Sequence, residues 1–241
     1  MTDIEAINNE LHSQLKDFNY CKISYRVYPS EALRGYKHSQ SKAYHQLEKY
    51  PLFSMTPAHS RFMEKYIKLQ QKKDIKIEPF MFTGEWPDGF VPPTAVENDS
   101  YGLAKNALFS EYEINSEYSL YVQLPGDKFV GHFIFHSKLN NIDLNTLLSQ
   151  KFVKKNLELT HFYLSRTYPS IINPYVNDGK IKKRTLSVLE QVARGANRHE
   201  TANTLFMSSR GVDYHLEKIR ENFKAKNNSD LIRLVKEGCI I

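Results

Sequence analysis

The stretch Lys183–Ile241 reads KRTLSVLEQVARGANRHETANTLFMSSRGVDYHLEKIRENFKAKNNSDLIRLVKEGCII, and its residue pattern predicts four short helices. The first helix is expected to end at Gly195, because glycine is the usual residue just past a helix C-terminus. Its apolar residues recur at helical spacing, as expected for one buried face; they are Leu186, Leu189, Val192 and Ala193.

The second helix is predicted to begin near Arg198. Asn197 precedes Glu200 by three residues, which is the spacing of a capping box, where each side chain satisfies the other's backbone N–H. We expect this helix to end at Met207 and to present four residues to the core: Thr201, Ala202, Leu205 and Phe206.

The third helix is predicted from about Ser209 to Lys224, after a turn of about three residues in which Ser208 and Ser209 can cap it. It carries one apolar stripe and is long enough to lie in a DNA major groove; the stripe is Val212, Leu216, Ile219 and Phe223. A fourth helix is expected after Asn227 and before Gly238. Two helices joined by a short turn have the spacing of a helix-turn-helix, which makes DNA the first partner to consider.

The distribution of charge supports that partner. From Asp178 onward the chain has thirteen Lys and Arg against eight Asp and Glu, whereas the residues before it have twenty against nineteen. Nearly all of the net charge of +6 therefore lies in the predicted helical segment, as neutralisation of DNA phosphates requires. A generic helical bundle or dimerisation tail would fit the helices but would not need this asymmetry.

The segment resembles the LuxR-type (FixJ/NarL-like) four-helix DNA-binding domain of bacterial transcription regulators. The matching positions are Arg184, Val188, Leu189, Gly195, Glu200, Ala202, Leu205, Ser208, Val212, His215, Leu216, Ile219, Phe223, Asn227, Gly238 and Ile240. The chain departs from that family at Thr185 and Ser187, where acidic residues are usual, at Gly211, where Thr is usual, and at Asp213, where a basic residue is usual.

The resemblance implies which side chains would meet DNA. Asp213, Tyr214 and Glu217 occupy the positions expected to face the bases. The remaining positions of the expected DNA-binding set are Arg198, Ser209, Arg210, Lys218, Arg220 and Lys224, the cations among them being candidates for phosphate contacts. The two carboxylates either read cytosine amino groups or pair with Arg210, Lys218 or Arg220 on the helix surface.

The N-terminal part predicts an α+β fold. An opening amphipathic helix is marked by Ile4, Ile7, Leu11, Leu15 and Phe18, and FNYCKISYRVY alternates as a strand. There follow a helix from Thr56 and Pro57, a strand at IKIEPFMF, a helix after Ser100, a hairpin turning at Pro125–Asp127, and a long helix from about Asp143 to Tyr163. Helices on the faces of one sheet describe a GAF/PAS-like α/β/α sensor-type domain.

The length of 241 residues suggests two domains. We predict a regulatory domain at residues 1–166, a linker at 167–180 holding Pro169, Pro174 and Gly179, and the all-α helix-turn-helix domain at 181–241. Cys21 and Cys239 are the only cysteines, so neither a disulfide framework nor a cysteine metal site is expected. The sequence also shows no signal peptide and no membrane span, and we expect a cytoplasmic protein.

The N-terminal part also resembles the autoinducer-binding domain of acyl-homoserine-lactone receptors. That family has a Trp and a Tyr four residues apart, then an Asp-Pro; this chain has Phe62 and Tyr66, then Glu78–Pro79. The family's Gly on a later strand falls on Glu117. With these changes, we expect a small-molecule ligand other than a standard acyl-homoserine lactone.

The expected ligand-contacting residues are Phe62, Tyr66, Glu78, Trp86, Tyr112 and Ser119. Aromatic residues suit a mostly apolar pocket, and they suit an ordinary core equally well. Glu78 lies in an apolar stretch, where a carboxylate costs free energy unless it is paired, bound to a ligand or at an exposed edge.

The sequence does not indicate an enzyme. It lacks HExxH, a P-loop, G-x-G-x-x-G and G-x-S-x-G, and we expect no cofactor and no metal. A receiver domain is also not indicated, because the chain begins with a predicted helix. The expected protein is a dimeric regulator that binds double-stranded DNA. Its N-terminal domain either senses a small molecule or is a ligand-free module for dimerisation or protein interaction.

Overall fold

The structure, a computed structural model, describes residues 2–29, 50–73, 89–90, 100–177, 179–237 and 240–241. Within these residues the N-terminal part is built on a five-stranded antiparallel sheet of order β2-β1-β5-β4-β3. Its strands are β1 (Cys21–Pro29), β2 (Phe53–Ser54), β3 (Gly89–Phe90), β4 (Ser116–Val122) and β5 (Phe129–Ser137). The predicted hairpin is present, and Gly126 in its turn has a φ of 76°, a conformation that favours glycine.

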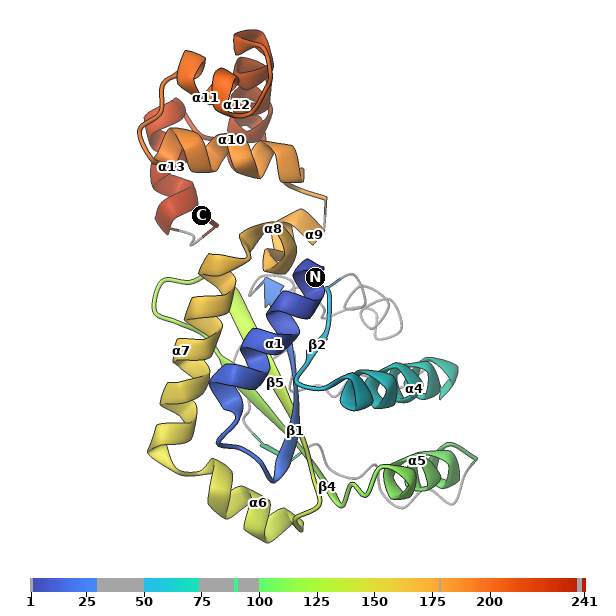
Figure 1. The fold of residues 1–241 in the computed structure, drawn as a ribbon. Helices are drawn as coiled ribbons and strands as arrows, with labels where there is room; N and C mark the ends of the chain where they lie inside the picture. Colours follow the sequence, from blue (N-terminus) through green and yellow to red (C-terminus); the bar gives the residue numbers. More distant parts are fainter. Residues whose placement is uncertain (1, 30–49, 74–88, 91–99, 178, 238–239) are drawn as a thin grey trace.

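Helices cover both faces of this sheet (Figure 1). One face packs against α1 (Asp3–Leu15), α6 (Asn141–Leu148) and α7 (Lys151–Thr167), and the other lies toward α4 (Pro57–Lys73) and α5 (Ser100–Glu111). Both faces of the central strands are therefore buried. The predicted fold class, an α/β/α sensor-type domain followed by an all-α domain, is confirmed.

The two faces differ in chemistry because side chains alternate along a strand. Toward α1 and α7 the sheet presents an apolar surface with aromatic pairs, such as Tyr25 and Phe133, whose ring centroids lie 4.7 Å apart. Toward α4 and α5 it presents polar and titratable side chains, which are Ser24, Glu117, Ser119, His132 and His136.

Two helix predictions in the N-terminal part were wrong. The long helix expected from Asp143 to Tyr163 is divided into α6 and α7, because Gln150 is extended and starts the second helix. The buried stripes explain the break: Leu148 and Val153 are five residues apart, so a single straight helix would not bury both with their neighbours. At the start of the chain, α1 ends at Leu15 and Phe18 is buried beyond the helix.

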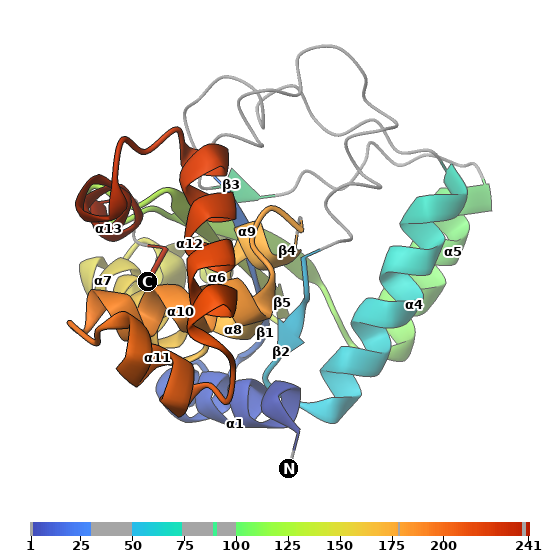
Figure 2. The same ribbon diagram turned by 90° about the horizontal axis from the view of Figure 1, so that it is seen from above.

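The C-terminal part forms the four predicted helices, α10 (Lys183–Ala193), α11 (Arg198–Thr204), α12 (Ser209–Phe223) and α13 (Asn228–Glu237). The expectation that the second helix ends at Met207 with Phe206 in the core was wrong. Phe206 has a φ of 49°, which ends the helical path, and its side chain is 94% exposed. Viewed from above, these helices lie over the α7 side of the sheet, away from α4 and α5 (Figure 2).

The segment predicted as a linker contains two short helices, α8 (Pro169–Ile172) and α9 (Pro174–Asn177). Asn173 between them donates from Nδ2 to the carbonyl oxygen of Ile240 over 2.9 Å, and its Oδ1 accepts from the backbone N–H of Tyr175. The Tyr175 ring in turn contacts Phe129 of β5 and Phe223 of α12, with centroid distances of 5.7 and 6.1 Å. The proposed boundary between the domains is thus crossed by hydrogen bonds and aromatic packing.

Candidate nucleic-acid interface and candidate ligand site

The start of α11 is fixed by the predicted capping box. The Asn197 side chain accepts from the backbone N–H groups of His199 and Glu200 at 2.9 and 3.0 Å, while Glu200 Oε2 accepts from the Asn197 N–H at 2.8 Å. The turn after α11 ends at Ser208, whose Oγ accepts from the Gly211 N–H at 3.1 Å and caps α12. Local hydrogen bonds therefore fix where each of the two helices begins.

Helix α12 is held by its apolar stripe. Val212, Leu216 and Ile219 are buried, and α12 packs against α10, α11 and α13. Thr185, where the LuxR family usually has an acid, is hydrogen-bonded through Oγ1 to Nδ1 of His215 at 2.9 Å and so ties α10 to α12. With one face buried, the opposite face of α12 is left to solvent.

Asp213, Tyr214 and Glu217 lie on that exposed face, as expected for base-facing positions. Asp213 Oδ2 is 3.1 Å from Nη1 of Arg198 on α11, and the two side chains are about half exposed. The pairing partners expected for Asp213 were all on α12, so this contact between the two helices was missed. It holds a cation of α11 against α12.

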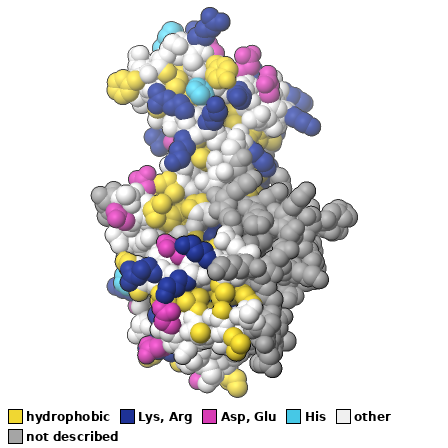
Figure 3. Space-filling view, turned by 90° about the vertical axis from the view of Figure 1, so that its right-hand side faces the viewer, with side chains coloured by type: hydrophobic (Ala, Val, Ile, Leu, Met, Phe, Trp, Pro, Cys, Tyr) yellow, Lys and Arg dark blue, Asp and Glu magenta, His cyan; other side chains and the backbone are white. Residues whose placement is uncertain are grey.

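The other expected DNA-binding residues lie along α12, from Ser209 at its start to Lys224 at its end. Arg210 and Lys224 are exposed, Lys218 lies with its Nζ 5.9 Å from the centre of the Tyr214 ring, and Arg220 is 3.9 Å from Glu217. Ser209 Oγ is hydrogen-bonded to His199 Nδ1 at 3.1 Å. On the face shown in Figure 3, Lys and Arg side chains cover much of the C-terminal helices.

Four of the six expected ligand-contacting residues can be placed; Glu78 and Trp86 lie outside the described residues. Phe62 is fully buried, and its ring centroid lies 5.6 Å from that of Tyr66 and 5.2 Å from that of Tyr112. Ser119 lies on the α4/α5 face of the sheet, hydrogen-bonded through Oγ to His132 Nε2 at 3.0 Å.

At the centre of this face is a carboxylate that the sequence analysis did not place in the site, Glu117. Its side chain is 9% exposed and has three partners: the Tyr66 hydroxyl donates to Oε2 at 2.9 Å, Lys105 Nζ is 3.7 Å from Oε2, and His136 Nε2 is 3.6 Å from Oε1. Lys105 also lies 5.0 Å from the centre of the Phe109 ring. The result is a buried charged cluster enclosed by aromatic rings.

Opposing effects set the protonation of Glu117. Burial by itself would raise its pKa, but the neighbouring His136, with help from Lys105 and the Tyr66 hydroxyl, holds the pKa below its ordinary value. The carboxylate is therefore ionised at neutral pH.

A chain of hydrogen bonds leads from this cluster into the sheet. His136 Nδ1 is 3.1 Å from His59 Nε2, His59 Nδ1 is 3.4 Å from Ser24 Oγ, and Ser24 Oγ is 2.9 Å from Ser54 Oγ. Burial, followed by the neighbouring His136, lowers the pKa of His59 to about 2, so this imidazole stays neutral.

Only a weak sequence signal points to these residues. Glu117 was noticed only as a departure from a family glycine, and Lys105, His59 and His136 carry no motif. They are far apart along the chain. The register of β4 with β5 sets Glu117 opposite His136, and the docking of α4 and α5 on the sheet adds His59 and Lys105.

Comparison with known proteins identifies the C-terminal domain. Residues 182–235 match the family described as "Bacterial regulatory proteins, luxR family", so this domain is a LuxR-type helix-turn-helix domain. The resemblance of its residues to that family is confirmed. In the described ranges, no helix is long and apolar enough to cross a membrane.

Solved structures give a weaker likeness over the whole chain. A crystal structure of Escherichia coli SdiA aligns with all of this chain and 93% of that chain at 15% identity and a TM-score of 0.44. A structure of SdiA in complex with octanoyl-rac-glycerol aligns with all of this chain and 91% of that chain at 16% identity and a TM-score of 0.40. Scores below 0.5 do not by themselves establish a common fold. No curated protein matches the chain.

Proposed function

We propose that this protein is a dimeric transcription regulator whose LuxR-type domain binds double-stranded DNA under the control of a small molecule held by the N-terminal domain. The observation that carries the DNA-binding part is the exposed face of α12, a helix that lies within the residues matching the LuxR family. The excess of thirteen basic over eight acidic residues from Asp178 onward supplies the charge that phosphate neutralisation needs.

The observation that carries the ligand part is the charged cluster around Glu117. A ligand on the α4/α5 face of the sheet would meet an ionised carboxylate, an ammonium group and an imidazole, with Phe62, Tyr66 and Tyr112 as its apolar walls. A standard acyl-homoserine lactone is a neutral molecule that would displace these charges from one another without replacing their charge. We therefore propose a ligand with a polar or charged head group, and we retain Glu78, Trp86 and Ser119 as further contacts.

DNA binding is tested with two proteins, the full chain and the fragment Ile181–Ile241. We expect the fragment to bind DNA weakly and the full chain to bind more tightly, because a dimer engages two half-sites about one helical turn apart. Fluorescence anisotropy at two salt concentrations measures both. Equal affinities, or affinities that do not change with salt, would contradict the proposal.

Ligand binding is tested by native mass spectrometry of the purified protein, followed by thermal shift assays with the extracted molecule and with acyl-homoserine lactones. We expect the extracted molecule alone to raise the melting temperature. Tyr66→Phe removes the hydroxyl that donates to Glu117 and should reduce this shift, whereas Tyr112→Phe, which keeps an equivalent ring in the same aromatic cluster, is the matched control.

A second function is favoured by one feature of the same cluster. The Glu117 carboxylate already has Tyr66, Lys105 and His136 as partners, so the charge is compensated by the chain itself. The N-terminal domain would then be a ligand-free module for dimerisation or for binding another protein. A purified protein that carries no small molecule, and is stabilised by none, would support this alternative.

A further inference from the structure

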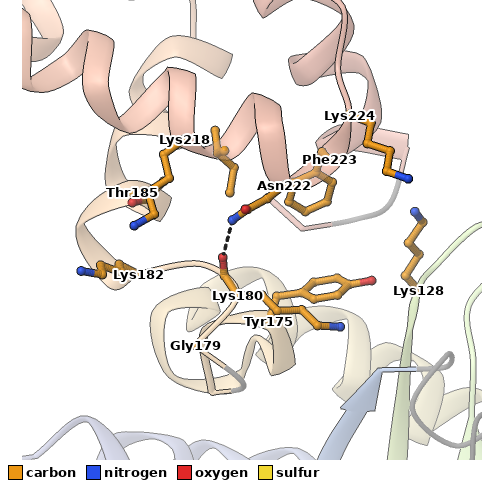
Figure 4. A pocket seen from close by; sticks show the side chains of 11 residues that line it. Lys128, Tyr175, Gly179, Lys180, Lys182, Thr185, Lys218, Asn222, Phe223 and Lys224 are labelled. Atoms are coloured by element: carbon orange, nitrogen blue, oxygen red, sulfur yellow. Dashed lines mark hydrogen bonds between the residues drawn. The ribbon is translucent and has the colours of Figure 1, made fainter.

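A second candidate site lies between the N-terminal domain and the recognition helix. It is a cavity of about 680 Å³ bounded on one side by α12 and on the other by α9 and the residues that lead into α10 (Figure 4). This volume lies within the range of pockets that hold small organic ligands. The cavity is separate from the Glu117 cluster, which lies on the α4/α5 face of the sheet.

The walls of this cavity are fixed by contacts between the two domains. The Tyr175 ring, only 5% exposed, lies against Phe223 of α12 with a centroid distance of 6.1 Å. Asn222 of α12 donates from Nδ2 to the carbonyl oxygen of Lys180 over 3.1 Å (Figure 4). The shape of the cavity therefore depends on how α12 packs against α9 and the segment before α10.

Its lining is strongly cationic. Five lysines line the cavity, namely Lys128, Lys180, Lys182, Lys218 and Lys224, and no Asp or Glu is among the described residues that do so. None of the five has a carboxylate partner in the described part of the chain; Lys180 lies 5.0 Å from the centre of the Tyr175 ring and Lys218 lies 5.9 Å from that of Tyr214. Lys128 comes from the N-terminal domain and Lys224 from the end of α12, and Figure 4 shows their ammonium groups pointing toward each other.

The effect of this charge is visible in a neighbouring group. The pKa of His215 is lowered, first by partial burial and then by the positive charges of Arg184, Lys182 and Lys218. Cations that converge on one cavity repel one another, and an anion that enters it removes that repulsion.

We propose that this cavity binds a small polyphosphate, such as a nucleoside di- or triphosphate, with the phosphate groups held by lysines of both domains. A single carboxylate or monophosphate would neutralise only part of the charge, whereas a polyphosphate matches several ammonium groups at once. The bound anion would tie Lys128 to Lys224 and so fix the recognition helix against the N-terminal domain.

The position of the cavity on α12 favours a small anion over the phosphates of DNA. Lys218 lies about 140° around the helix from Asp213 and about 40° from Tyr214, so it is at the edge of the face expected to enter the groove. Asn222, one turn further along, is hydrogen-bonded to the segment before α10. The distinction between a small anion and DNA therefore depends on Lys128 and Lys180, which line the cavity but lie outside α12 and outside the expected DNA-binding set.

The test uses the full-length protein and isothermal titration calorimetry with inorganic triphosphate and with ATP, in magnesium-free buffer at physiological salt. We expect saturable binding of both, weakened about tenfold or more by Lys128→Gln combined with Lys180→Gln. Lys151→Gln is the matched control, because Lys151 is an exposed lysine at the start of α7 and outside the cavity. Absence of saturable binding, or an equal loss in the control, overturns the proposal, as does adenosine binding as tightly as ATP.

A DNA titration of the same variants separates the two sources of phosphate. We expect the Lys128→Gln, Lys180→Gln variant to keep the wild-type affinity for DNA and its salt dependence. A lower salt dependence, with the slope reduced by about 2, would assign these lysines to DNA phosphates and overturn the small-anion site. The proposed DNA-binding function would survive that result, since it does not depend on the cavity.

Discussion

Each of the two domains contains an ion pair, and the pair is exposed to water in the C-terminal domain but buried in the N-terminal domain. On the C-terminal domain, Asp213 and Arg198 are 3.1 Å apart and about half exposed. In the N-terminal domain, Glu117 and Lys105 are 3.7 Å apart with side chains only 9% exposed, and His136 adds a third titratable group. Although its charged atoms are closer together, the Asp213–Arg198 pair contributes less to the free energy of unfolding, because water screens it.

The difference follows from what each domain has to do. The charged face of a DNA-binding helix is exposed to water in the free protein, so its ion pairs can be replaced by contacts with DNA. A sheet covered on both faces cannot exchange its charges, so every group there must be paired within the chain or by a ligand. Perturbation of charge should therefore affect the N-terminal domain first and most.

Acid gives the largest expected effect. Burial is the first cause that lowers the pKa of His59 to about 2 and of His132 and His161 to about 3. Above pH 6.5 these histidines are neutral in both states; below it only the unfolded chain takes up their protons, so stability falls as the pH falls from 6.5 toward 3. Each histidine contributes up to about 1.4 kcal/mol per pH unit in that window.

The measurement is circular dichroism of the full chain and of the fragment Ile181–Ile241 between pH 7 and 3. We expect the near-ultraviolet signal of the full chain to be lost at a higher pH than the helical signal of the fragment. Equal acid midpoints would show that the buried histidines do not control the stability of the N-terminal domain.

Glu117→Gln is the next largest perturbation. Removing one partner of a buried ion pair leaves the Lys105 ammonium group uncompensated, and we expect the free energy of unfolding to fall by about 3 kcal/mol. Chemical denaturation followed by near-ultraviolet circular dichroism measures this. Combining Glu117→Gln with Lys105→Met should recover part of the lost free energy of unfolding. In the exposed pair, Asp213→Asn should lower the free energy of unfolding by less than about 1 kcal/mol. Similar losses for Glu117→Gln and Asp213→Asn would remove the contrast between the two domains.

A pair of glycines tests packing in the same two regions. A Cβ on Gly131 of β5 would lie 2.8 Å from His161 Nδ1 and 3.2 Å from Tyr25 Cε2, and the Tyr25 hydroxyl is hydrogen-bonded to that nitrogen at 2.7 Å. We expect Gly131→Ala to destabilise the protein by about 1 to 3 kcal/mol. On α12, a Cβ on Gly211 would come no closer than 3.4 Å to Ser208 Oγ, so Gly211→Ala should stabilise by about 0.5 to 1 kcal/mol. Thermal unfolding of both variants checks the two signs.

Residues near in sequence account for most of what could be predicted. The capping box at Asn197 and Glu200, the four C-terminal helices and the hairpin around Gly126 depend on neighbours a few residues away, and these predictions were confirmed. The division of the long helix also had a local signal, the step of five from Leu148 to Val153, which a count of apolar residues alone overlooks.

The candidate ligand site depended on contacts that no local pattern contains. Glu117 meets Tyr66 across 51 residues and Ser24 meets His59 across 35, so sheet register and helix docking had to be known first. The prediction that Phe206 lies in the core was wrong for a different reason. The helical spacing was right up to Leu205, but the backbone leaves the helix at Phe206 and turns its ring into solvent.

The smallest expected effect on stability is that of Asp213→Ala, and its consequence lies in DNA binding. In the free protein Asp213 holds Arg198, and near DNA its charge repels phosphates while its oxygens can accept from the N4 amino group of cytosine. Removing the Asp213 carboxylate should raise the affinity for random-sequence DNA by roughly fivefold, as expected for the loss of about 1 kcal/mol of repulsion. It should also lower the preference for an operator, recovered by in vitro selection, by about 1 to 3 kcal/mol. Glu217→Ala is the companion variant, since Glu217 also lies on the face expected to meet the bases but pairs within its own helix with Arg220 at 3.9 Å. Anisotropy titrations with both DNAs give the ratio of specific to random binding. If Asp213→Ala leaves that ratio unchanged, Asp213 reads no base and serves only to hold Arg198 against α12.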